Sequence, residues 1–160
     1  MSNWKYKGKV IKELDDMPDE VFGFIYRVTH KPSGKKYLGR KQLIYERKRK
    51  IGKRETKRLK EEKKEAGEDH WWIVPKYKYV KKESDWKSYY GSAEDIQKLL
   101  EKDGEDAFDR EILDFAYHKK QLNYKEVKLL FEQNVLEDDL YINSNIQGKF
   151  YPKDALDQIE

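Results

Sequence analysis

The sequence contains no cysteine among its 160 residues, so disulfide bonds and thiolate metal sites are excluded. Long apolar runs are also missing. A membrane-spanning helix needs about 20 consecutive apolar residues, and no such run occurs. The chain does not begin with a charged stretch followed by an apolar one, the pattern of a secretion signal. We therefore expect a soluble cytoplasmic protein with no membrane partner.

Apolar residues are scarce and charged residues are abundant. Hydrophobic residues make up 37% of the chain and charged residues 41%, so we expect a modest core and a highly solvated surface. The length corresponds to one domain, with room for an appended arm. Aromatic residues make up 14% of the chain, which argues against global disorder.

The charges are unevenly distributed along the chain. Residues 40–82 carry 17 Lys and Arg against 7 Asp and Glu, a net charge of +10. Residues 101–160 carry 8 against 15, a net charge of −7. Such asymmetry is typical of a protein that binds a polyanion such as nucleic acid. The alternative is a solvated helix whose charges only keep the protein soluble.

The pattern of apolar residues predicts an α/β (α+β) fold with a three-stranded antiparallel sheet flanked by helices. Alternation and turn residues predict a β-hairpin over 21–39. A capping-box pattern at Ser92 predicts a helix that ends at Gly104, followed by a strand over 108–115. A second cap signal at Asn123 predicts another helix, and a short extended return follows it.

Two segments lie outside this pattern. Residues 1–20 are interpreted as an N-terminal extension that packs weakly on a domain spanning 21–145, and residues 146–160 as a tail. Residues 48–86 are interpreted as a basic insertion. Because aliphatic residues are sparse over 40–64, we expect a surface helix or helical pair there, then a loop or short edge strand.

Tyr26 and Tyr37 are expected to lie across the hairpin from each other, within side-chain reach. A buried tyrosine is usually a core residue, but the flanking residues are informative. Phe24-Ile-Tyr26 is followed eleven residues later by Tyr37-Leu-Gly39. This pair of triplets resembles the hairpin of the GIY-YIG nuclease superfamily, and the layout is similar to nucleases of this type encoded by large tailed phages. The first triplet departs from the pattern, since Phe24 replaces glycine.

The resemblance implies further site residues. A catalytic arginine is expected on a helix after the second strand. Arg47 has that spacing, and Arg40 is a nearer substitute. The run Leu129–Leu136 fits the helix that carries the family's glutamate, which makes Glu132 the candidate. The family's histidine is absent, because Ile51 occupies its position.

The resemblance implies a metal-dependent DNA endonuclease in which Glu132 holds Mg²⁺ or Mn²⁺. Tyr26 would orient or deprotonate the attacking water, and a nearby cation would have to lower its pKa for it to act as a base. The alternative role for Glu132 is a surface ion pair with Lys128. Glu126 is the reserve ligand, or else the capping partner of Asn123.

DNA is the expected partner, since phosphate contacts suit the basic residues. The candidate DNA-contacting residues are Lys41, Lys48, Arg49, Lys50, Lys53, Arg54, Lys76, Lys78, Lys87 and Asn143. Homing-type cleavage and cleavage of competitor DNA both fit, and a homodimer would allow both strands to be cut. The rival functions are a non-catalytic nucleic-acid-binding protein and a protein inhibitor that uses the charged face.

Overall fold

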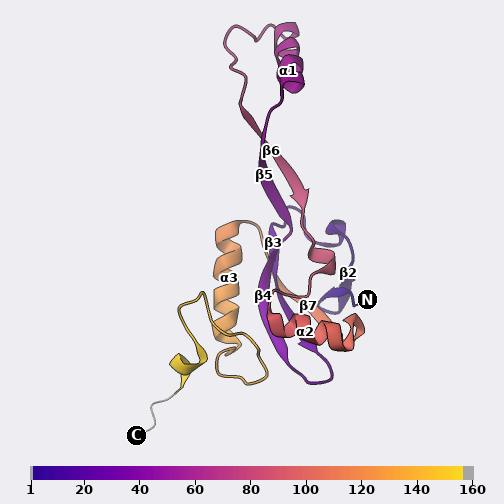
Figure 1. Ribbon diagram of the computed structural model, residues 1–160, viewed down its shortest axis with the longest axis vertical. Coiled ribbons are helices and arrows are strands. Elements are labelled where there is room, and N and C mark those ends of the chain that lie inside the picture. The colour runs from indigo at the N-terminus through magenta and orange to yellow at the C-terminus, as the bar shows by residue number, and fades with distance from the viewer. Residues whose placement is uncertain (1, 157–160) are drawn as a thin grey trace. The chain divides into compact units, whose positions relative to one another are not determined.

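The computed structural model describes residues 2–156, which divide into two compact units. The first unit comprises the described residues up to Leu43 and from Ser84 onward, and the second spans Ile44–Glu83. Figure 1 labels most of the helices and strands of both units. Within residues 2–156, no helix combines the length and the apolar character needed to cross a bilayer.

The first unit is built on a mixed sheet of five strands in the order β2-β1-β7-β3-β4. The strands are β1 (Trp4–Tyr6), β2 (Lys9–Ile11), β3 (Gly23–His30), β4 (Lys36–Gln42) and β7 (Phe108–Ala116). β3 pairs antiparallel with both β4 and β7, which confirms the predicted hairpin and the predicted third strand. The prediction of only three antiparallel strands is wrong, because β1 joins the sheet parallel to β7 and β2 pairs with β1.

The N-terminal segment is part of the core, so the expectation of weak packing is wrong. Trp4 is 1% exposed, and its indole nitrogen donates a 2.7 Å hydrogen bond to the Trp86 carbonyl. The Trp4 ring also meets Phe24 and Tyr26 edge to face. β1 and β2 have three residues each, too few for alternation to reveal a strand in the sequence.

Helix α3 (Lys119–Glu132) packs against β3, β4 and β7. It begins at Lys119, so the predicted start at Asn123 is wrong: the His118 ring nitrogen caps the helix by accepting from the Gln121 amide. The core beneath it contains Ile25, Leu38, Ala116, Leu122, Leu130, Val135, Tyr141 and Ile146.

Helix α2 (Glu94–Asp103) ends at Gly104, as predicted. Its N-cap is Ala93 and makes no side-chain capping bond, so the capping box predicted at Ser92 does not form. Short 3₁₀ turns complete the unit at Leu14–Asp16, Trp86–Ser88, Glu105–Ala107 and Pro152–Ala155.

The second unit is a two-stranded antiparallel hairpin, β5 (Ile44–Lys50) with β6 (Tyr77–Glu83), and its connection contains helix α1 (Lys53–Glu65). The expectation of helix throughout 40–64 is therefore wrong for the first half of that stretch. Both hairpin strands are mostly exposed, so they bury no apolar face that would mark them as strands in the sequence. The edge strand expected within 70–82 is confirmed as β6.

Candidate functional site

Tyr26 and Tyr37 form the centre of the candidate site. In the β3–β4 register, Tyr26 lies opposite Gly39 and Tyr37 opposite Val28, so the tyrosines are diagonal neighbours on one face of the sheet. Their ring centroids are 6.3 Å apart. The predicted approach of the two side chains across the hairpin is thus confirmed.

Two glycines make room for these rings. A Cβ on Gly39 would lie 2.6 Å from the Tyr26 hydroxyl oxygen and 3.2 Å from the Tyr37 ring, so the Tyr26 ring occupies the space that any other residue would need. Gly91 has φ +111° and approaches the Tyr37 ring closely, which adds a conformational reason for glycine. The tyrosines are therefore held between two backbone segments.

The segment from Ser84 to Ser92 contributes a third tyrosine, which the sequence analysis did not identify. Tyr89 meets Tyr26 edge to face at 5.7 Å and is hydrogen-bonded to its side chain. The Ser92 hydroxyl lies 3.4 Å from that of Tyr37. The dense aromatic and glycine pattern Tyr-Tyr-Gly at 89–91 was the available sequence signal.

Lys41 is buried beside this tyrosine cluster. Its ammonium donates to the Asp85 carboxylate at 2.5 Å and lies 3.9 Å from the centre of the Tyr89 ring. Only 8% of Lys41 is exposed. Its charge is therefore paired within the fold, at a residue that the sequence offers as a DNA contact.

Arg40 and Glu126 form the charged part of the site. The Arg40 guanidinium donates to the side-chain oxygen Oδ1 of Asn123 at 2.8 Å and lies 3.9 Å from a Glu126 carboxylate oxygen. The Glu126 side chain is 17% exposed, whereas that of Arg40 is 42% exposed. Glu126 also lies near enough to Tyr26 and Tyr37 for its negative charge to act on both. The structure thus brings together two tyrosines, an arginine and a half-buried carboxylate.

The electrostatics of the site favour protonated groups. Burial raises the pKa of Tyr26 well above its ordinary value, and the neighbouring tyrosines and Glu126 add to this shift. Burial also raises the pKa of Tyr37 and that of Glu126, although the Arg40 charge partly offsets the latter. The expectation that a nearby cation lowers the Tyr26 pKa is therefore not met by the surrounding protein groups.

Glu132 and Arg47 lie elsewhere. Glu132 ends α3, is 53% exposed and faces Lys128 at 3.9 Å, the surface pair considered as its alternative. Arg47 lies on strand β5 of the second unit and not on a helix. Of the two candidate glutamates, Glu126 lies near the tyrosines, and of the two candidate arginines, Arg40 lies in the same unit as the tyrosines.

Asn143 is 8% exposed and clamps strand β4. Its side-chain oxygen Oδ1 accepts from the Leu38 backbone amide at 3.1 Å, and its side-chain nitrogen Nδ2 donates to the Leu38 backbone carbonyl at 2.8 Å. Tyr141 forms a parallel bridge with Lys36 on the same strand. The Asn143 hydrogen bonds therefore fix Leu38, the residue directly before Gly39, which contacts the Tyr26 ring.

The remaining candidates for DNA contact are dispersed. Lys87 pairs with Glu13 at 2.6 Å in the first unit. The others are exposed or half-exposed in the second unit: Lys48, Arg49, Lys50, Lys53, Arg54, Lys76 and Lys78. Of these, Lys78 is ion-paired with Glu55.

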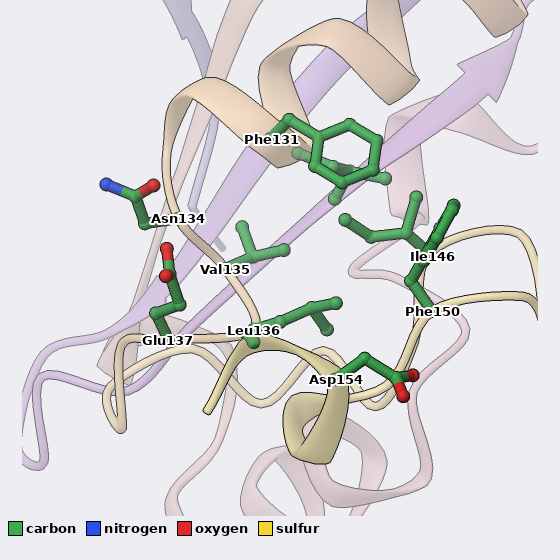
Figure 2. A pocket seen from close by; sticks show the side chains of 10 residues that line it. Phe131, Asn134, Val135, Leu136, Glu137, Ile146, Phe150 and Asp154 are labelled. Carbon is green, nitrogen blue, oxygen red and sulfur yellow. The ribbon is translucent and has the colours of Figure 1, made fainter. Parts of the chain in front are cut away.

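No group of three or more His, Asp or Glu side chains within residues 2–156 forms a cation cage. The Glu126 carboxylate offers the donor type that Mg²⁺ prefers, and a single carboxylate suits an ion that keeps most of its waters. A separate cavity of about 230 Å³ lies between the end of α3 and the C-terminal segment. Figure 2 shows that its lining is mainly apolar, with Val135, Leu136, Ile146 and Phe150 around it, so it is unsuited to phosphate.

Comparison with known families identifies one match. Residues 4–146 match the family model SegE_GIY-YIG, which describes the GIY-YIG domain of segE, a proposed endonuclease. The match covers both units and includes the N-terminal strands. No curated protein and no solved structure matches the chain.

Proposed function

Because this chain belongs to the SegE GIY-YIG endonuclease family, whose members are phosphodiester-hydrolysing nucleases, we propose that it is a divalent-metal-dependent DNA endonuclease. Its working residues are Tyr26, Tyr37, Arg40 and Glu126. The observation that carries this assignment is the convergence of the tyrosine pair with the Arg40–Glu126 pair in one unit.

Glu126 is the residue that would hold Mg²⁺ or Mn²⁺. Its carboxylate is largely shielded, and its cationic partner is 3.9 Å away, a loose pairing that leaves oxygen lone pairs for a metal ion. A bound divalent ion would supply Lewis-acid polarisation of a phosphate oxygen and would stabilise the leaving oxygen.

Tyr26 and Arg40 have distinct roles in this proposal. Since the raised pKa keeps the Tyr26 phenol protonated near neutral pH, Tyr26 orients the attacking water through a hydrogen bond and does not remove its proton. Arg40, whose guanidinium is partly exposed, stabilises the charge that develops on the phosphate.

The reaction itself balances as a hydrolysis. The water oxygen forms a bond to phosphorus as the bond from phosphorus to the 3′ oxygen breaks. The water gives up one proton to solvent, and the 3′ oxygen takes one up, which leaves 5′-phosphate and 3′-hydroxyl ends. Homing-type cleavage at a defined site and broader cleavage of competitor DNA both use this chemistry, and mapping of the cut positions separates them.

Plasmid nicking tests the proposal with a matched pair of substitutions on one helix. Supercoiled DNA is incubated with wild type, Glu126→Gln and Glu132→Gln in Mg²⁺, in Mn²⁺ and in EDTA. We expect metal-dependent nicking by wild type and Glu132→Gln, and a loss of at least about 100-fold in Glu126→Gln. Nicking retained by Glu126→Gln but lost in Glu132→Gln would contradict this proposal and would identify Glu132 as the metal ligand.

The rival function, a non-catalytic DNA-binding protein, gives a different result. It predicts that wild type binds DNA in a salt-sensitive manner but cleaves neither single-stranded nor double-stranded DNA with any divalent ion. Tyr26→Phe provides a second check on the site. It keeps the ring that fills the aromatic core but removes the hydroxyl, so cleavage should fall while the unfolding midpoint changes little.

A further inference from the structure

The β5–β6 hairpin of the second unit presents two faces of different chemistry. Because directly paired residues of neighbouring strands share a face, the register assigns every side chain to one face or the other. One face, here called the arginine face, consists of Tyr45, Arg47, Arg49, Lys78, Val80 and Lys82. The opposite face, here called the lysine face, consists of Ile44, Glu46, Lys48, Lys50, Tyr77, Tyr79, Lys81 and Glu83.

The charge differs between the faces. The arginine face carries four cations and no carboxylate from either strand, whereas the lysine face carries three cations and two glutamates. Helix α1 adds to the arginine face at its Lys78 end, where Lys78 donates to Glu55 at 2.5 Å and Arg58 lies 3.7 Å from the same carboxylate. In the described part of the chain, neither Arg47 nor Lys82 has a carboxylate within ion-pair distance.

The strand surface around Arg47 and Arg49 is also hollowed. A depression of about 360 Å³ is lined by Arg47, Arg49, Val80 and Lys82 of the arginine face and also by Lys48 and Lys81 of the lysine face. Two apolar groups stand among the cations of the arginine face, Tyr45 at 44% exposure and Val80 at 37%. Exposed tyrosines also stand on the lysine face, but the strand arginines do not share a face with the strand glutamates, and a ribbon that only maintained solubility would not need that separation.

The dimensions of the hairpin fit one groove of duplex DNA. The major groove of B-form DNA is about 12 Å wide and admits a two-stranded β-ribbon, whereas the minor groove is only about 6 Å wide. Seven residues per strand extend over roughly 23 Å, less than one turn of the duplex, about 34 Å. Arginine forks match the paired acceptors of guanine, and apolar groups match the thymine methyl group.

We propose that the β5–β6 hairpin binds in the major groove of duplex DNA through its arginine face, with Arg47 and Arg49 contacting base edges. The proposal rests on the proposed function only in taking DNA as the partner. It assigns sequence reading to a ribbon in the second unit, while the chemistry stays with the tyrosine site of the first.

A charge-matched comparison of the two faces tests this inference. Arg47→Gln/Arg49→Gln and Lys48→Gln/Lys50→Gln each remove two positive charges from the same strand, on opposite faces. Binding to a 30-base-pair fluorescent duplex is measured by anisotropy at several salt concentrations. EDTA is present throughout, so the result does not depend on cleavage. Circular dichroism checks that both variants are folded.

We expect the arginine variant to lose about 10- to 100-fold in affinity, and the lysine variant less than about 3-fold. Wild type should protect guanine N7, a major-groove atom, from methylation by dimethyl sulfate. Arg47→Lys/Arg49→Lys keeps the charge but lacks the paired donors, so it should retain most of the affinity and lose the protection.

Equal losses in the two charge-matched variants would overturn the proposal, since they would indicate diffuse electrostatic binding. Tight binding by wild type without N7 protection would overturn the groove assignment. The two proposals fail separately. If wild type binds as expected but does not nick DNA in Mg²⁺, the proposed function falls and the ribbon assignment stands. If wild type nicks DNA but the two charge-matched variants lose affinity equally, the ribbon assignment falls and the proposed function stands.

Discussion

Gly39→Ala tests whether the tyrosine site depends on the missing side chain at this position. An added Cβ would lie 2.6 Å from the Tyr26 hydroxyl oxygen and 2.9 Å from the adjacent ring carbon. Ordinary contact begins at about 3.4 Å, so the hydroxyl must shift by about 0.8 Å. Tyr26 is 1% exposed and enclosed by Trp4 and Tyr89, so its ring has little room to move.

Two effects set the stability of this variant. Overpacking of a tight core costs about 1–3 kcal/mol. Replacing a strand glycine by alanine recovers about 0.5–1 kcal/mol of backbone entropy. We therefore expect Gly39→Ala to lower the free energy of unfolding by about 0.5–2 kcal/mol. The effect on cleavage should be larger, because a misplacement of about 1 Å in a catalytic group costs roughly 100-fold in rate.

Urea unfolding and plasmid nicking measure the two effects separately. Gly52→Ala is the control, because an added Cβ there meets no atom within 4 Å. Tyr26→Phe removes the oxygen of the closest contact, so Gly39→Ala should cost less stability in the Tyr26→Phe background than in the wild type. Additive losses, or full cleavage by Gly39→Ala, would refute the steric reasoning.

Two further substitutions test the supports of the site. The hydrogen bond from Lys41 lowers the pKa of Asp85, so this pair stabilises the fold above about pH 4, and the contribution is lost as the pH falls through the Asp85 pKa. Asp85→Asn should thus lower the free energy of unfolding by about 1 kcal/mol at pH 7, a small value because Asp85 is largely exposed. Urea unfolding at pH 3 should show a smaller difference between the variant and the wild type. Asn143→Ala leaves the buried amide and carbonyl of Leu38 without partners and should cost about 2–4 kcal/mol in the same assay at pH 7, whereas an unchanged midpoint would contradict the clamp.

The sequence predicted the parts of the fold whose residues alternate over a full strand. Strands β3, β4 and β7 have seven or more residues each, long enough for the apolar pattern and the turn residues to reveal them, and all three were predicted. Strands β1 and β2 were not predicted because three residues are too few to show a period. Their place in the sheet is supported by a contact distant in sequence, the hydrogen bond from Trp4 to the Trp86 carbonyl. Strand β5 was not predicted for another reason. Its residues are almost all exposed, so the sequence shows no alternation of apolar and polar residues there.

The sequence favoured Glu132 over Glu126 because the flanking aliphatic residues were given more weight than helix geometry. Leu122, Glu126 and Leu130 are spaced four residues apart, so they lie on the same stripe of α3, and both leucines are buried. A carboxylate on the apolar stripe of a helix is desolvated, and the raised pKa of Glu126 reflects that burial. Glu132 lies two positions beyond Leu130, about 200° around the helix, where its side chain is exposed to solvent and pairs with Lys128. A carboxylate that interrupts the buried stripe of a helix is a stronger indication of function than a charge surrounded by aliphatic neighbours in sequence. Applied to α3, that criterion selects Glu126, and the comparison of Glu126→Gln with Glu132→Gln tests the criterion as well as the site.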